Sequence, residues 1–317
     1  MRHLIKAGVL GCTLALGLTA MTAQANDGQQ CQTVRFTDPG WTDISSTNAL
    51  AGTVLDALGY QTEVSTLAVP IGFEGMKNGE IDVFLGNWMP AQQKFIDKYA
   101  GPGDIDIVGP NLHGAKFTLA VPKYVYEAGV KDFADLAKHA DKFRQRIYGI
   151  EAGAPVNQLL QKMINSGDFN LKDWSLVESG EQGVLSQVKR AVKRKQFMVF
   201  LGWEPHPMNS NFELAYLTGG DKYFGPDFGG ATIHTLTRKG YQQACPNVGK
   251  LLQNLKFTLA MENEMMGHIL DGNLPPADAA REWLAQNPQV LDNWLDGVTT
   301  RTGEPGLAAV KDYLLIN

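Results

Sequence analysis

Three tryptophans occupy similar places in the sequence, each one or two residues after a glycine that ends a strand-like run. They stand in Pro39-Gly40-Trp41, Gly86-Asn87-Trp88 and Gly202-Trp203. Glycine permits sharp turns and close backbone approach, so the indole that follows it can be presented into a cleft. Converging aromatic faces suit a quaternary ammonium, whose charge attracts the rings and whose methyl groups donate no hydrogen bond. The alternative is that these indoles only fill the ends of a sheet.

Two of these tryptophans lie in matching segments. Val83–Pro90 has the sequence VFLGNWMP, and Val199–Pro205 has the sequence VFLGWEP. Ligands of parallel α/β sheets bind outside the carboxyl ends of the strands. The repeat therefore predicts two tryptophans at one cleft, although a four-residue match can also arise from strand composition alone.

The magnitudes favour a cage over a single carboxylate. A desolvated cation–π contact contributes about 2 kcal/mol, so three or four give roughly 6 to 8 kcal/mol before the cost of association. Micromolar affinity requires about 8 kcal/mol. Asp43 could add attraction or bind a polar group of the ligand. The remaining tryptophans follow helical or strand periodicity and are predicted to be core residues: Trp174, Trp283 and Trp294.

The sequence lacks the signatures of common catalytic sites: Gly-x-Ser-x-Gly, a Walker-type phosphate loop, His-Glu-x-x-His and Gly-x-Gly-x-x-Gly. Its six histidines are scattered, and none pairs with another at metal-ligand spacing. No Cys-x-x-Cys pair is present. We therefore expect no metal, cofactor or redox chemistry. His206 is predicted to cap or support a neighbouring element.

Strand and helix patterns alternate along the chain. Strands are expected at 33–37, 61–67, 81–85, 117–121, 147–150, 175–177, 197–201, 214–217 and 232–237. Helices are expected at 48–58, 133–143, 156–164 and 184–195, with several more from Gly240 onward. This order predicts an α/β chain with mostly parallel sheets. The length suggests about two domains, and no linker separates them.

The N-terminus is typical of a secretory signal: Arg2 and Lys6, an apolar stretch from Ala7 to Met21, then Ala23-Gln24-Ala25. Cleavage after residue 25 would leave 292 residues and change the formal charge from −5 to −7. We expect a periplasmic protein that is not membrane-embedded, and the acidic charge argues against nucleic acid as a partner. Cys12 weakly suggests lipid attachment as an alternative.

Cys31 and Cys245 are the cysteines left after cleavage, an even pair in an oxidising compartment. We predict that they form a disulfide, which would close a loop of more than two hundred residues and stabilise the chain by roughly 5 kcal/mol. The alternative is two separate buried thiols.

Three motifs in order, Asp38-Pro39-Gly40-Trp41-Thr42-Asp43, Gly86-Asn87-Trp88-Met89-Pro90 and Gly202-Trp203-Glu204-Pro205-His206, resemble the periplasmic substrate-binding proteins of glycine betaine, proline betaine and choline ABC importers. The resemblance extends over the mature chain and is strongest to the choline-binding branch. It implies an α/β, type II periplasmic-binding fold with two lobes and a ligand cleft between them. The first lobe would contain residues 28–113 and 213–317, and the second would contain the inserted residues 114–212.

The resemblance also implies a ligand site. The aromatic box maps onto Trp41, Trp88, Trp203 and Phe117, and the acidic partner of a ligand hydroxyl maps onto Asp43. Two positions depart from the choline-binding pattern. Phe117 stands where a tyrosine is typical, and Ala154 stands where an asparagine is expected, although Asn157 one helical turn later could take its place.

The implied function is capture of a small quaternary ammonium, with choline first and glycine betaine or carnitine next, and delivery to an ABC permease. A monomer is expected. Another zwitterion or an amino acid is the alternative ligand. A periplasmic choline-ester hydrolase that uses Asp43, Glu204 and His206 is the enzymatic rival, but no nucleophile with an adjacent base is visible.

Overall fold

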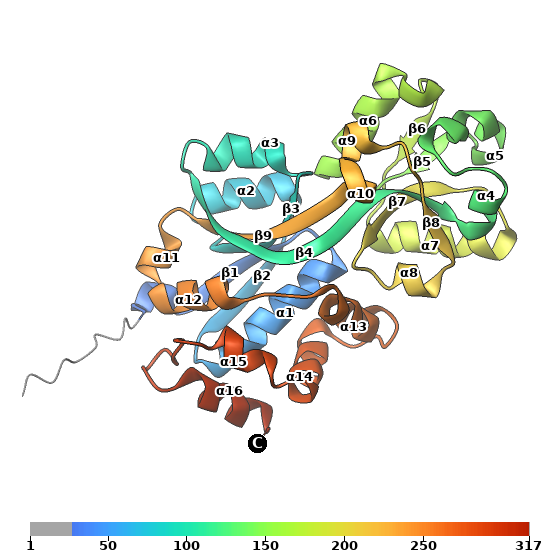
Figure 1. Ribbon diagram of the computed structural model, residues 1–317. Helices are drawn as coiled ribbons and strands as arrows, with labels where there is room; N and C mark the ends of the chain where they lie inside the picture. Colours follow the sequence, from blue (N-terminus) through green and yellow to red (C-terminus); the bar gives the residue numbers. More distant parts are fainter. Residues whose placement is uncertain (1–26, 317) are drawn as a thin grey trace, which may run out of the picture.

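A computed structural model describes residues 27–316 of the chain, which form a mixed α/β molecule (Figure 1). The predicted signal segment and Cys12 lie outside these residues. The strands are β1 Thr33–Asp38, β2 Gln61–Thr66, β3 Val83–Met89, β4 Ile105–Pro122, β5 Arg146–Tyr148, β6 Ser175–Val177, β7 Val199–Glu204, β8 Leu214–Tyr216 and β9 Gly230–Arg238.

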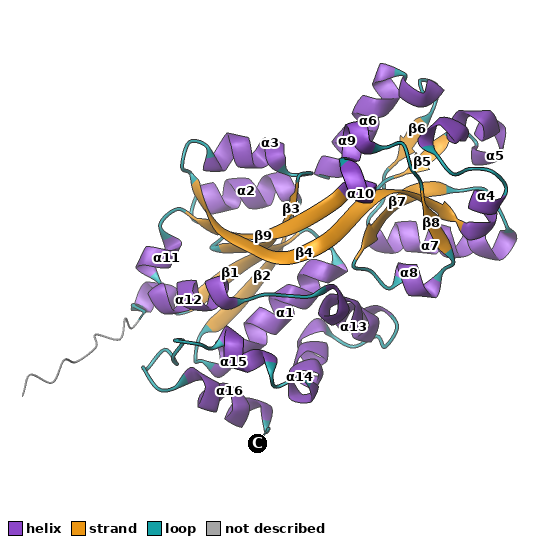
Figure 2. Cartoon of the chain, viewed as in Figure 1, coloured by secondary structure: helices purple, strands orange, loops and turns teal. Residues whose placement is uncertain are grey.

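Helices surround these strands (Figure 2). They are α1 Thr42–Ala57, α2 Val69–Lys77, α3 Gln93–Phe95, α4 Lys123–Glu127, α5 Ala140–Phe143, α6 Pro155–Ser166, α7 Glu181–Arg194, α8 Met208–Asn211, α9 Asp221–Phe224, α10 Pro226–Gly229, α11 Tyr241–Ala244, α12 Pro246–Asn254, α13 Leu259–Leu270, α14 Pro276–Gln286, α15 Val290–Trp294 and α16 Gly306–Leu314. Short 3-10 helices occur at Gln29–Cys31, Phe133–His139 and Asp168–Asn170, and a π-helical turn at Ile96–Ala100.

The strands form one sheet in the order β2-β1-β3-β9-β4-β7-β5-β6, with β8 paired to β4. Pairing is parallel among β1, β2 and β3 and among β5, β6 and β7. It is antiparallel wherever β4 or β9 takes part. The prediction of mostly parallel sheets therefore holds only in the outer parts, because the chain crosses the middle in long strands instead of helical crossovers.

The molecule has two lobes joined by β4 and β9 (Figure 1). One lobe carries β1 to β3 with α1 to α3 and α11 to α16, and the other carries β5 to β8 with α4 to α9. Two contacts lie beyond the return boundary expected at residue 213: β8 pairs with Ala120–Pro122 of β4, and the Tyr223 hydroxyl donates to Asp168. We therefore propose a later return to the first lobe. The chain returns to the first lobe through β9, and the other boundary falls inside β4.

Helix α1 begins at Thr42, six residues before the start expected from the sequence. Gly40 has a positive φ of 87°, which lets the chain turn directly from β1 into the helix. Two carboxylates outside the helix accept N–H groups at its start: Asp38 Oδ1 accepts from Gly40 and Trp41, just before the helix, at 2.7 and 3.2 Å, and Glu181 accepts from Thr42 at 2.9 Å. These partners replace the cap expected at residues 45–47 and place residue 43 on the first turn.

The predicted disulfide is confirmed. Cys31 and Cys245 are bonded, with their Cα atoms 5.7 Å apart. The bridge ties the start of β1 to the junction of α11 and α12 within the first lobe. Trp174, Trp283 and Trp294 are also buried as core residues, as predicted.

Candidate functional site

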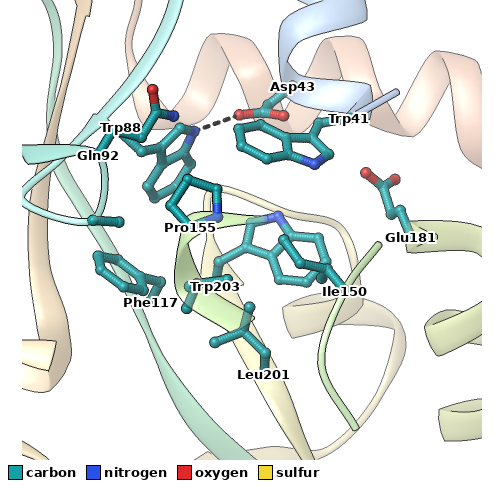
Figure 3. Close-up of a pocket in the computed structure, with 12 residues that line it drawn as sticks. Trp41, Asp43, Trp88, Gln92, Phe117, Ile150, Pro155, Glu181, Leu201 and Trp203 are labelled. Atoms are coloured by element: carbon teal, nitrogen blue, oxygen red, sulfur yellow. Dashed lines mark hydrogen bonds between the residues drawn. The ribbon is translucent and has the colours of Figure 1, made fainter. Parts of the chain in front are cut away.

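One pocket draws its lining from both lobes (Figure 3). Five of the predicted site residues meet there: Trp41, Asp43, Trp88, Phe117 and Trp203. The other lining residues are Ala91, Gln92, Ile150, Pro155, Val156, Glu181 and Leu201. The indole rings that the sequence placed at strand ends therefore surround a common space.

Strand register sets the position of two aromatic walls. Phe117 on β4 is the direct partner of Trp203 on β7 across an antiparallel ladder, so their side chains share one face. Trp88 at the end of β3 packs edge to face against Phe117, with ring centroids 6.2 Å apart and an interplanar angle of 89°. These three rings are buried, and Trp41 is half-buried at the start of α1.

The repeated strand motif gives two similar strand ends. Both end in a cis peptide bond before proline, at Met89-Pro90 and Glu204-Pro205. Gly202 is required by close packing, because a Cβ there would lie 2.9 Å from the Cβ of Ala120. The matching segments therefore present Trp88 and Trp203 to the pocket from opposite lobes.

Asp43 is one of two buried carboxyl groups that line the pocket, and 2% of it is exposed. Its Oδ2 accepts a hydrogen bond from Trp88 Nε1 at 3.0 Å. Burial, and then the charge of Glu181, raise the pKa of Asp43 to about 7, against the lowering effect of the indole N–H. Asp38 adds to the rise, and burial together with Asp43 raises the pKa of Glu262 on α13 well above its usual value.

Glu181 lines the pocket and was missed by sequence reasoning. It is the first residue of α7, and 3% of it is exposed. Its carboxylate accepts from the backbone N–H of Thr42 at 2.9 Å and from the Thr42 hydroxyl at 2.5 Å. Its place directly after Gly180, just beyond a strand, repeats the strand-then-glycine pattern that located the tryptophans. The same search applied to acidic residues would have found it.

Glu151 lies beyond the end of β5 and reaches Trp41. Its Oε1 accepts a hydrogen bond from Trp41 Nε1 at 3.0 Å. Burial raises the pKa of Glu151, although the bond from the indole opposes the rise. Glu151 and Glu181 thus connect the second lobe to two consecutive residues of the first.

Ala154 and Asn157 do not line the pocket. Ala154 precedes α6, and the next two residues form the wall in its place. Asn157 Oδ1 accepts from the N–H of Ile150 at 3.0 Å, and its Nδ2 donates to the Ile150 carbonyl and to Glu178, each at 2.9 Å. The Asn157 amide therefore holds the loop before α6, and the ligand contact expected of this residue remains a prediction.

His206 supports a neighbouring element, as predicted. Its Nδ1 accepts the N–H of Met208 at 2.9 Å, so its Nε2–H faces Glu181 Oε1 at 3.3 Å. Glu204 instead pairs with Lys116. Of the three residues that the hydrolase hypothesis uses, only Asp43 lines the pocket.

The electrostatic character of the pocket is acidic. Among its twelve lining residues, two are carboxylates and none is lysine or arginine. Aromatic faces and carboxylates without a cationic side chain suit a positively charged ligand.

The sequence profile of the substrate-binding domain of ABC-type glycine betaine transport systems matches residues 32–286. The chain belongs to this family. Its fold is the type II periplasmic-binding fold with two lobes that the sequence predicted. Members of this family serve as binding proteins of transport systems, which agrees with the expectation of a non-enzymatic role.

Known proteins of the family resemble the whole chain or part of it. An ABC-transporter choline-binding protein in complex with choline is 53% identical, covers 91% of this chain and 100% of its own, and superimposes with a TM-score of 0.89. Lactococcal OpuAC, closed and complexed with glycine betaine, is 29% identical over 83% of this chain and 99% of its own, with a TM-score of 0.75. The glycine betaine/carnitine transport binding protein of Listeria monocytogenes is 32% identical over 52% of this chain and 53% of its own.

Within residues 27–316, no helix combines the length and the apolar character needed to cross a bilayer.

Proposed function

We propose that this protein binds a small quaternary ammonium cation, with choline as the preferred ligand, in the periplasm and delivers it to an ABC permease. The observation that carries the proposal is the meeting of four aromatic rings from both lobes around one acidic pocket. Similarity to a choline-binding protein over 91% of the chain supports the same ligand class.

The pocket favours choline over glycine betaine. Glycine betaine carries a carboxylate, which would face Asp43 and Glu181 with no cationic side chain among the lining residues to offset it. Choline carries a hydroxyl in place of that carboxylate, and Asp43 has a second oxygen able to accept it. Gln92 is occupied elsewhere, because its amide binds Gly86 and Asn87. Asp43 is therefore the hydroxyl partner in this proposal.

Isothermal titration of choline, glycine betaine, carnitine and proline tests the ligand class. Wild type should bind choline at micromolar or lower concentration and glycine betaine more weakly. A Trp88→Leu variant keeps apolar volume but loses an aromatic face, and should bind choline at least tenfold more weakly.

Trp174→Leu is the matched control, because it also removes a buried indole but lies outside the pocket. It should lose stability and keep its choline affinity. Equal choline affinity in wild type and Trp88→Leu would reject the cage. Preference for proline over every methylated ligand would assign the pocket to amino acids.

A further inference from the structure

Two carboxylates of the second lobe accept hydrogen bonds from consecutive residues of the first lobe. Glu181 accepts from the backbone and hydroxyl of Thr42, and Glu151 accepts from the indole of Trp41. Both contacts reach the N-terminus of α1, a helix of 16 residues. They join the lobes at the point where Trp41 contributes its wall of the pocket.

Glu181 also contacts His206, which packs against the Trp203 wall of the pocket. The imidazole donates toward Glu181 and packs edge to face on Trp203, with ring centroids 5.0 Å apart. The buried carboxylate of Glu181 thus contacts Thr42 of α1 in the first lobe and His206, which packs on Trp203, in the second lobe.

The first turn of α1 has a physical need for this partner. The residue before the helix is Trp41, whose side chain makes no capping hydrogen bond. The positive end of the helix dipole and its free N–H groups favour a nearby anion. Asp38 accepts from Gly40 and Trp41 within the first lobe, whereas the N–H and hydroxyl of Thr42 donate to Glu181 of the other lobe. The contact of Thr42 with Glu181 therefore exists only while the lobes are together.

The same closure carries an electrostatic cost. It brings Glu181 next to Asp43, and the charge of Glu181 is one cause of the raised pKa of Asp43. Both groups line the pocket. A cation between them offsets their repulsion, whereas a neutral occupant does not.

We propose that Glu181 is the closure latch of this protein, a positioning residue that binds α1 across the cleft and makes closure depend on the charge of the ligand. The inference rests on the proposed function, because a quaternary ammonium is the cation that the latch encloses. Thr42 is its partner in the first lobe.

Two variants separate the latch from direct attraction of the ligand. Thr42→Val removes the hydroxyl that donates a hydrogen bond to Glu181, and it leaves every charged side chain of the pocket in place. Glu181→Gln removes the charge. Ser46→Ala is the matched control, because this buried hydroxyl on the same helix bonds only the carbonyl of Thr42 within the first lobe.

Closure is read from the distance between spin labels at Glu80→Cys and Lys162→Cys, exposed positions on opposite lobes. Cys31 and Cys245 are bonded to each other and do not take the label. With saturating choline, wild type and Ser46→Ala should give one short distance. Thr42→Val and Glu181→Gln should show an added longer distance and release choline about tenfold faster, the effect expected for a lost charge-assisted hydrogen bond.

The outcomes distinguish the two proposals. Wild type that binds choline and closes, together with variants that close and release choline as wild type does, overturns the latch and leaves the proposed function intact. Wild type that binds no quaternary ammonium overturns both. The latch is supported if Thr42→Val shows the longer distance and the faster choline release while Ser46→Ala shows neither. It further requires that the double variant, Thr42→Val with Glu181→Gln, releases choline no faster than Glu181→Gln alone.

Discussion

Replacing the ligand's charge, with its shape preserved, tests the central reasoning most directly. The compound 3,3-dimethyl-1-butanol has a tert-butyl group where choline has a trimethylammonium, and it keeps the hydroxyl. Apolar burial and shape complementarity are therefore nearly the same for both ligands. The difference in their binding free energies reports the charge alone.

The magnitude follows from the walls of the pocket. Four aromatic rings line the pocket, and if each makes a desolvated cation–π contact of about 2 kcal/mol with the proposed ligand, the total is about 8 kcal/mol. Choline loses hydration that the alcohol never had, which offsets part of this gain. If more than half of the cation–π contribution is offset in this way, about 3 kcal/mol remains in favour of choline. That difference corresponds to roughly a hundredfold tighter binding of choline than of the alcohol. Asp43 and Glu181 act in the same direction, so this figure is a lower bound.

Competition calorimetry, in which choline displaces the alcohol, measures the ratio of the two dissociation constants. We expect the alcohol to bind at least a hundredfold more weakly to wild type, and the gap to narrow in Trp88→Leu. An alcohol that binds within tenfold of choline would show that the rings act as an apolar slot and that the charge contributes less than about 1.4 kcal/mol.

Choline affinity should fall as the pH drops through about 7, because the cation favours the charged form of Asp43. Calorimetry in buffers of different ionisation enthalpy would detect the proton that Asp43 releases when choline binds. The Asp43→Asn variant should lose this pH dependence. The ligand-free protein should respond in the opposite sense. Folding raises the pKa of Asp43 from 3.8 to about 7, so its contribution to stability is complete below about pH 4 and is lost as the pH rises through 7. The melting temperature without ligand should be higher at pH 5 than at pH 8, and equal values would contradict the buried carboxyl. Replacing Cys31 and Cys245 by serine should lower the free energy of unfolding in urea by roughly 5 kcal/mol, and a reductant should reproduce the loss in wild type only.

The aromatic walls could be predicted from the sequence because their signals are local. A buried strand followed by glycine and tryptophan fixes where the indole emerges, and the carboxyl end of a strand fixes the edge of the sheet. The disulfide could be predicted equally well, since only two cysteines lie beyond the predicted signal segment. These features need no knowledge of which elements meet in space.

Other features depend on tertiary contacts and could not be found in this way. Helix α1 begins at Thr42, earlier than expected, because Glu181, 139 residues away in the sequence, accepts the N–H of Thr42. Strand β4 was expected only at 117–121, since Gly109, Pro110 and Gly114 indicate a loop before it. Pairing with β9 overrides that signal, and register shifts between Ile107 and Gly109 and between His113 and Ala115 accommodate the interruptions.

The two kinds of residue in the pocket select for different properties of the ligand. Aromatic faces attract a cation without accepting strong hydrogen bonds, so they suit a trimethylammonium, which has no donors to satisfy. Asp43 and Glu181 act against ligands that carry their own negative charge. These carboxylates come from opposite lobes, and their repulsion is greatest when the lobes are closed. In the function proposed above, recognition of the cation and closure of the cleft are therefore parts of one electrostatic balance, because none of the residues that line the pocket is a lysine or arginine and the ligand supplies the positive charge.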